Sequence, residues 1–190
     1  MDEIDVRRRK ARRTLAAVAL LCAAPVVASY VAYYVLHPSA RTNYGELEAK
    51  PAPEIVGATA GGASWRLASL RGRWVLLVLE ADGCERACER SLYATRQART
   101  IQGREQDRIE RVLLQPPGAA PPDAALLAQH PGLTVAQAEP RQWTSLLGGE
   151  AQSILLVDPL GNLVLRYPPD PDIRGLARDL ERVLKASRIG

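Results

Sequence analysis

The stretch from Leu15 to Leu36 contains no charged side chain. A helix needs about 20 apolar residues to cross the hydrocarbon core of a bilayer. This stretch of 22 residues therefore predicts a transmembrane helix over residues 15–36. The residues before it form a separate basic tail, 1–14, and the residues after it must fold outside the bilayer.

The basic tail predicts the orientation of the helix. It carries six Lys or Arg and three Asp or Glu side chains. Basic residues remain on the cytoplasmic side of a span, and tyrosines gather at the interfaces. We therefore expect a single-pass protein of the inner (cytoplasmic) membrane, with the tail in the cytoplasm, Tyr30, Tyr33 and Tyr34 at the opposite interface, and the rest of the chain in the periplasm.

Two other interpretations of this segment are open. Val26-Val-Ala28 is a tolerable cleavage site for a signal peptide, although the apolar run continues well beyond it. A lipid anchor on Cys22 is disfavoured because Leu20 and Leu21 stand where small residues should precede the cysteine. We favour an uncleaved span with Cys22 as a thiol inside the membrane.

The net charge of the chain mainly reflects this topology. The formal charge is +4, of which the tail contributes +3, leaving +1 for all the other residues. A nucleic-acid site needs Lys and Arg gathered on one face, whereas residues 53–190 intersperse both signs. The sequence therefore argues against nucleic-acid binding.

The exported part divides into a linker and one domain. Residues 37–52 have no apolar periodicity, and the stretch from His37 to Pro53 contains three prolines, which is typical of a juxtamembrane linker. Residues 53–190 are long enough for one domain with a core.

Apolar patterning predicts the order of elements in that domain. Predicted strands cover residues 64–68, 74–79, 109–114, 133–136, 153–157 and 163–167, and predicted helices cover 87–102, 124–129, 141–147 and the stretch from 172 onward. We expect 64–68 to form a hairpin with 74–79, and 153–157 with 163–167. This order describes an α/β, thioredoxin-like fold with a central mixed sheet flanked by helices.

Cys84 and Cys88 follow the apolar strand 74–79 and begin the predicted helix. The positive end of a helix dipole favours thiolate over thiol, and thiolates exchange disulfides or bind soft metals. Cys84 is the expected attacking thiol because it lies nearer the strand end. The alternative is that both cysteines pack as small apolar residues. The polar cluster around Gly83 favours a reactive pair at a surface turn.

Three segments resemble the Sco/SenC group of membrane-anchored, thioredoxin-like proteins. They are Leu70-Arg-Gly-Arg-Trp-Val-Leu-Leu77, Cys84-Glu-Arg-Ala-Cys88 and Leu156-Val-Asp-Pro-Leu-Gly161. The resemblance implies a role in assembling the copper centre of cytochrome c oxidase, with an oxidase subunit or its assembly factors as partners. It also implies Cu(I) binding by the two cysteines and one downstream histidine.

The histidine of that family has no counterpart here. Its expected neighbourhood reads Gly149-Glu-Ala-Gln-Ser153, which puts Glu150 at its place and leaves the third copper ligand unidentified. His130 is expected to end a helix, where the dipole favours its charged form. The proline that thioredoxins keep before the strand of Ile154 is absent as well.

Three functions remain open from the sequence. The first is an oxidase assembly factor that handles copper or partner thiols through Cys84 and Cys88. The second is a thiol-disulfide oxidoreductase of broader role. The third is an anchored scaffold with a static disulfide. A Ser/His/Asp hydrolase is not arguable with two histidines, and no glycine-rich motif has phosphate-loop spacing.

Overall fold

A computed structural model of the chain describes residues 2–34, 43–81, 84–147 and 152–187. The chain divides into two compact units, Met1–Thr42 and Asn43–Gly190. The first contains helix α1, Asp2–Tyr34, with Pro25 inside it. Its stretch Arg7–Ala32 is long and apolar enough to cross a membrane. The helix therefore begins well before the predicted start at residue 15, because the basic tail is helical too.

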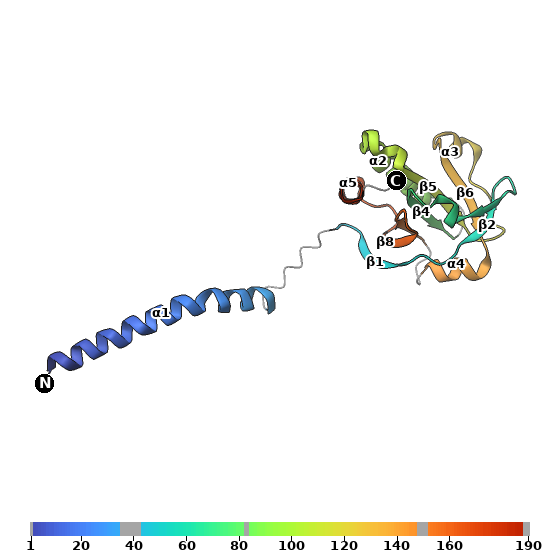
Figure 1. Ribbon diagram of the computed structural model, residues 1–190. Coiled ribbons are helices and arrows are strands. Elements are labelled where there is room, and N and C mark those ends of the chain that lie inside the picture. Colours follow the sequence, from blue (N-terminus) through green and yellow to red (C-terminus); the bar gives the residue numbers. More distant parts are fainter. Residues whose placement is uncertain (1, 35–42, 82–83, 148–151, 188–190) are drawn as a thin grey trace. The chain divides into compact units, whose positions relative to one another are not determined.

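The second unit is built on one mixed sheet (Figure 1). Its strands in the described residues are β1 (Glu46–Pro51), β2 (Val56–Thr59), β3 (Ser64–Arg66), β4 (Trp74–Glu80), β5 (Ile109–Gln115), β6 (Leu133–Ala138), β7 (Gln152–Val157) and β8 (Asn162–Tyr167). Their spatial order is β1-β8-β7-β4-β5-β6-β2-β3. Strands β4, β5 and β6 run parallel, and the other pairings are antiparallel.

Helices cover both faces of the sheet. The helical elements are η1 (Leu67–Leu70), α2 (Arg86–Ile101), η2 (Gly103–Arg108), α3 (Ala124–Ala128), α4 (Pro140–Leu147) and α5 (Ile173–Ala186). Figure 1 shows α2 and α5 on one side of the sheet and α4 on the other. The predicted thioredoxin-like α/β fold is confirmed.

Strand β4 is buried on both faces because it is central and has neighbours on both sides. Successive side chains of a strand point to opposite faces. Trp74, Leu76 and Val78 therefore join the core under α2 and α5, whereas Val75 and Leu77 join the core that includes Trp143 of α4. The tryptophans at 65, 74 and 143 are all buried, as packing residues.

The predicted hairpin between residues 64–68 and 74–79 is wrong. Strand β3 pairs with β2 at the edge of the sheet, and three other strands separate it from β4. Residues 67–70 form η1, which interrupts the predicted strand. Strand β2 was not predicted, since its sequence Val-Gly-Ala-Thr lacks bulky residues. Position 57 requires glycine, because a Cβ there would lie 1.7 Å from the carbonyl oxygen of Gln137.

The sheet also begins earlier than the sequence indicates. Residues 46–51, within the stretch expected to be linker, form β1 and pair with β8. Most of β1 is exposed, so its sequence carries little apolar signal. The hairpin of β7 and β8 is confirmed. The Asp158 carboxylate accepts bonds from the amides of Leu160 and Asn162 at 2.9 and 2.7 Å and so closes its turn.

Candidate functional site at the end of strand β4

Cys84 and Cys88 lie where β4 gives way to α2. In the structure their sulfur atoms form a disulfide, and their Cα atoms are 5.0 Å apart. Cys84 precedes the N-cap residue Glu85, and Cys88 lies in the first turn of α2. The chain's third cysteine, Cys22, is a free thiol in α1.

The first turn of α2 offers backbone donors near the two sulfur atoms. The first amides of a helix have no acceptor within the helix, and here the Glu85 side chain does not cap them. Such amides and the helix dipole stabilise a thiolate relative to a thiol. Disulfide reduction at this position would therefore leave at least one sulfur in a setting that favours its reactive form.

The two sulfurs differ in exposure. Cys88 is 1% exposed and belongs to the core between the sheet and α2, whereas Cys84 is half-buried and packs against the edge of that core. A partner thiol can reach Cys84 more easily than Cys88. This asymmetry agrees with Cys84 as the attacking residue and Cys88 as the resolving residue, the roles predicted from their order along the chain.

Charges around the pair are partly neutralised. Arg90, two residues after Cys88, forms an ion pair with Asp170 at 2.6 Å. Asp170 follows β8, has a φ of +55°, and donates its amide to the Ser91 hydroxyl at 3.1 Å. This pair was not predictable from the sequence because Asp170 is 80 residues away from Arg90. Arg86 is exposed and, within the described residues, has no carboxylate partner, so it is the basic side chain best able to assist a thiolate.

Glu80 is the last residue of β4 and is 1% exposed. It shares the strand face of Leu76 and Val78, the face on which α2 and Cys88 pack. An ionised carboxylate on that face would oppose a nearby thiolate. Its burial was not predictable from its charge. The other acidic residue just before the thiols in the sequence, Asp82, lies outside the described residues.

Thioredoxins keep a proline just before the strand that contains Ile154, and this chain lacks it. That strand position pairs with the end of β4, beside the cysteine pair. Gln152 and Ser153 of β7 pair with Glu80 and Leu79. Ser153 is buried, and its hydroxyl accepts a bond from Arg166 at 2.9 Å. A serine therefore occupies the strand end where a thioredoxin would place a proline.

His130 does not behave as a charged helix-end residue. It lies just after α3 but is 4% exposed, and its Nδ1 has no hydrogen-bond partner in the described structure. Burial, followed by the positive charges of Arg111 and Arg96, lowers the pKa of His130 from 6.5 to about 4. The expected stabilisation of imidazolium by the helix dipole is therefore wrong, and the ring is neutral at neutral pH.

The two sulfurs supply soft ligands of the kind Cu(I) prefers. In the described ranges, however, no group of three or more His, Cys, Asp and Glu side chains is placed to hold a metal ion. His130 therefore does not complete a site with the cysteine pair. Glu150 lies outside the described residues, so its predicted position at the family's histidine stays a prediction. The described side chains would therefore hold copper through the two cysteine sulfurs alone.

A protein-family model described as "Transmembrane-like, thioredoxin-like, C-terminal domain" matches residues 74–187, which is more than half of the chain. The chain belongs to this family. No curated protein matches it in sequence. The match to this transmembrane-like, thioredoxin-like family begins at β4 and includes both cysteines, α2 and α5.

Solved structures with the same fold include Sco proteins. Apo Sco1 from Thermus thermophilus has a TM-score of 0.61 and 21% identity, covering 76% of this chain and 99% of that one. Yeast Sco1 with copper bound has a TM-score of 0.60 and 13% identity, covering 73% and 94%. A thiol:disulfide interchange protein from Bacteroides sp. has a TM-score of 0.56 and 17% identity, covering 74% and 91%.

Sco proteins and a disulfide interchange protein thus share the fold of this member of the transmembrane-like, thioredoxin-like family. The predicted resemblance to Sco proteins is confirmed at the level of the fold. A shared fold does not by itself transfer an activity.

Proposed function

We propose that the chain is a membrane-anchored, exported thioredoxin-like protein that acts in cytochrome c oxidase biogenesis through the thiol pair Cys84 and Cys88. The main support is the asymmetric pair at the start of α2, with one half-buried and one buried sulfur. Similarity in fold to BsSco, which is described as a member of the Sco family of cytochrome c oxidase assembly proteins, supports the oxidase role.

The proposed chemistry is disulfide exchange with a partner. An exported dithiol reductant first reduces the Cys84–Cys88 bond and is itself oxidised. The Cys84 thiolate then attacks a partner disulfide, forming a mixed disulfide and releasing one partner thiolate. The Cys88 thiolate attacks the Cys84 sulfur, which releases the second partner thiolate and restores the intramolecular disulfide. Two electrons thus pass from the reductant to the partner.

The proposed location is the periplasmic side of the inner membrane. Helix α1 contains a stretch of suitable length and composition, and the basic residues precede its apolar part. Disulfides persist in exported compartments and are rare in the cytosol. The Cys84–Cys88 disulfide is therefore consistent with an exported domain.

Besides exchanging disulfides with a partner, the reduced cysteine pair is suited to hold copper. Yeast Sco1 was solved with copper bound, and reduced Cys84 and Cys88 would provide two thiolates. We propose that Cu(I) is a cargo held weakly by these two thiolates, because the described residues provide no third side chain of the usual ligand types.

A redox titration of the full chain in nanodiscs tests the function. We expect a midpoint well above about −300 mV, the value below which structural disulfides fall. We expect Cys88→Ser to trap a mixed disulfide with a disulfide-bonded oxidase copper-subunit peptide, because the resolving thiol is lost. Cys84→Ser should not trap it, and the reduced wild type should lose Cu(I) to a modest chelator.

Cys22→Ser is the matched control and should behave as the wild type in every arm. A midpoint below about −300 mV would favour the static-disulfide scaffold instead. Trapping of unrelated substrates as efficiently as the oxidase peptide would favour an oxidoreductase of broader role. Tight Cu(I) binding by the wild type would show that a third ligand exists.

A further inference from the structure

The chain enters the folded domain against α5. The amides of Tyr44 and Gly45 donate to the carboxylate of Asp179 at 3.2 and 2.9 Å. The Tyr44 hydroxyl accepts a bond from the amide of Asp172 at 2.9 Å. A Cβ on Gly175 would lie 2.6 Å from the Tyr44 ring, so this ring lies directly on the helix. The connection from α1 therefore meets the domain at the N-terminal half of α5.

Two exposed arginines flank this point without a counter-charge. Arg174 and Arg178 precede Gly175 and Asp179, and in the described part of the chain neither contacts a carboxylate. The basic residues further along α5 differ, because Arg182 pairs with Asp179 and Lys185 pairs with Glu181. Cations in the first turn of a helix also face the positive end of its dipole, so Arg174 does not stabilise α5 in this way.

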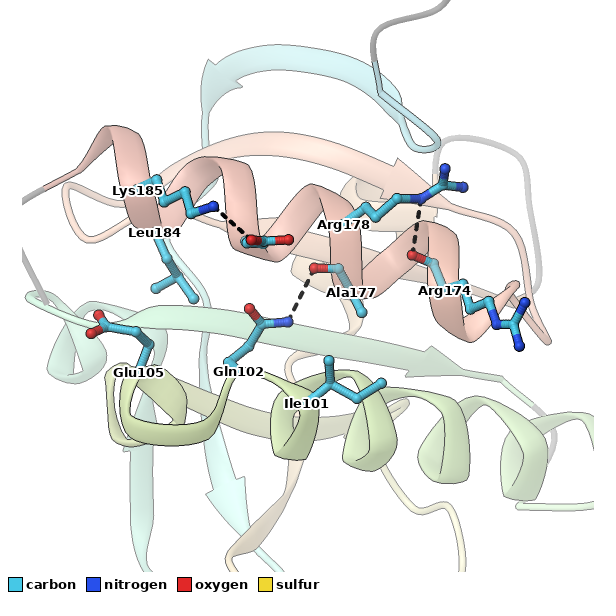
Figure 2. Close-up of a pocket in the computed structure, with 9 residues that line it drawn as sticks. Ile101, Gln102, Glu105, Arg174, Ala177, Arg178, Leu184 and Lys185 are labelled. Carbon is cyan, nitrogen blue, oxygen red and sulfur yellow. Dashed lines mark hydrogen bonds and ion pairs between the residues drawn. The ribbon is translucent and has the colours of Figure 1, made fainter.

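An exposed apolar side chain lies beside these arginines. A groove between the C-terminal end of α2 and α5 is lined by Ile101, Ala177 and Leu184, together with Arg174 and Arg178. Glu105, Glu181 and Lys185 line it as well, and both carboxylates are already paired, Glu105 with Arg108 and Glu181 with Lys185. Ile101 is 60% exposed. Figure 2 shows Ile101 directed toward α5, Gln102 bonded to the Ala177 carbonyl, and both guanidinium groups at the N-terminal end of α5. Basic and apolar side chains on one face are typical of surfaces that lie on membranes.

We propose that this face, defined by Ile101, Arg174 and Arg178, binds the anionic lipid headgroups of the membrane that holds α1. The proposal rests on the membrane anchoring stated under the proposed function. Residues 35–42 can span at most about 30 Å when fully extended, which limits how far Tyr44 can lie from the end of α1. Tethering makes docking intramolecular, so that weak attraction suffices. Each arginine near an anionic surface should favour docking about 5-fold.

Fluorescence quenching on the full chain tests the proposal. A fluorophore is attached at Thr100→Cys in a Cys22→Ser background with the native disulfide intact, and a spin label is placed on lipid headgroups. Nanodiscs contain phosphatidylcholine alone or with about 30% phosphatidylglycerol. We expect quenching with phosphatidylglycerol, loss of quenching at high salt, and no competition by inorganic phosphate. Arg174→Gln with Arg178→Gln should lower the docking constant about 25-fold.

The matched control removes the same charge elsewhere. Arg66→Gln with Arg141→Gln changes exposed arginines of β3 and α4 and should leave quenching unchanged. Arg174→Lys with Arg178→Lys should retain docking, which separates lost charge from damaged folding. Equal quenching in phosphatidylcholine, or equal loss in the control, would overturn the proposal. A chain released by alkaline carbonate would overturn the anchoring as well, whereas an anchored chain without quenching overturns only the docking.

Discussion

His130 couples the stability of the domain to pH. The unfolded imidazole binds a proton near pH 6.5, whereas the folded one remains neutral down to about pH 4 because it is buried beside Arg111 and Arg96. Between these values the unfolded state binds more protons, so the free energy of unfolding falls as pH falls. The loss should reach about 2 kcal/mol between about pH 7.5 and pH 5.

Urea denaturation of wild type and His130→Gln at several pH values measures this effect. The difference between the two proteins isolates His130 from the carboxylates. Glu48, whose pKa is lowered mainly by its bond to Arg166, contributes equally to both. A wild-type curve that parallels that of His130→Gln from about pH 7.5 to 5 would contradict the shift.

Single residues were predictable where their neighbours in sequence define their surroundings. Cys84 and Cys88 follow an apolar strand and start a helix, so their place at the strand-to-helix turn could be predicted from local pattern, whereas the burial of Cys88 in the core could not. The burial of Glu80 and the Arg90–Asp170 pair depend on contacts between distant segments. No local pattern carries that information.

At the scale of single elements, one buried carboxylate holds the N-terminal segment of the domain on helix α5. Asp179 is 1% exposed and accepts the amides of Tyr44 and Gly45, which connects the N-terminal end of the domain to the helix. Asp179→Ala would leave both amides without their acceptor. We expect a loss of about 2–4 kcal/mol in the free energy of unfolding, together with faster proteolysis near residue 44.

Asp107→Ala is the control for this substitution. Asp107 also pairs with an arginine, Arg99, but at 3.7 Å and with 89% of its side chain exposed. Exposed ion pairs contribute little, so the change should remain within about 0.5 kcal/mol. Similar losses in both variants would show that Asp179 has no special role in holding the N-terminal segment.

Elements with strong apolar periodicity were predicted well. Helix α5 and the hairpin of β7 and β8 match their predicted positions to within about two residues. Strands β1 and β2 were missed because the first is mostly exposed and the second is short and rich in small residues. These two strands are defined by pairing with β8 and β6, which lie far away in the chain, and a local pattern cannot reveal such partners.

The topology of the whole molecule gives a prediction of its own. Alkaline phosphatase requires an oxidising, exported compartment, so a fusion after residue 42 should be active and a fusion after residue 13 should not. Replacing the six basic residues of the tail by glutamine should reduce the activity of the first fusion. The reverse activity pattern would place the domain in the cytoplasm and remove the basis for the proposed redox role.

The strand order determines when the sheet of the domain can be completed during synthesis. Strand β1 pairs with β8, and the central strand β4 pairs with β7. These early strands therefore cannot complete their pairing until the C-terminal part of the chain has been synthesised. Contacts of such long sequence separation form slowly. Cys84 and Cys88 are separated by only three residues and can be oxidised in the emerging chain before any of these pairings exist. The nascent polypeptide can therefore reach its final tertiary structure with this small ring already closed.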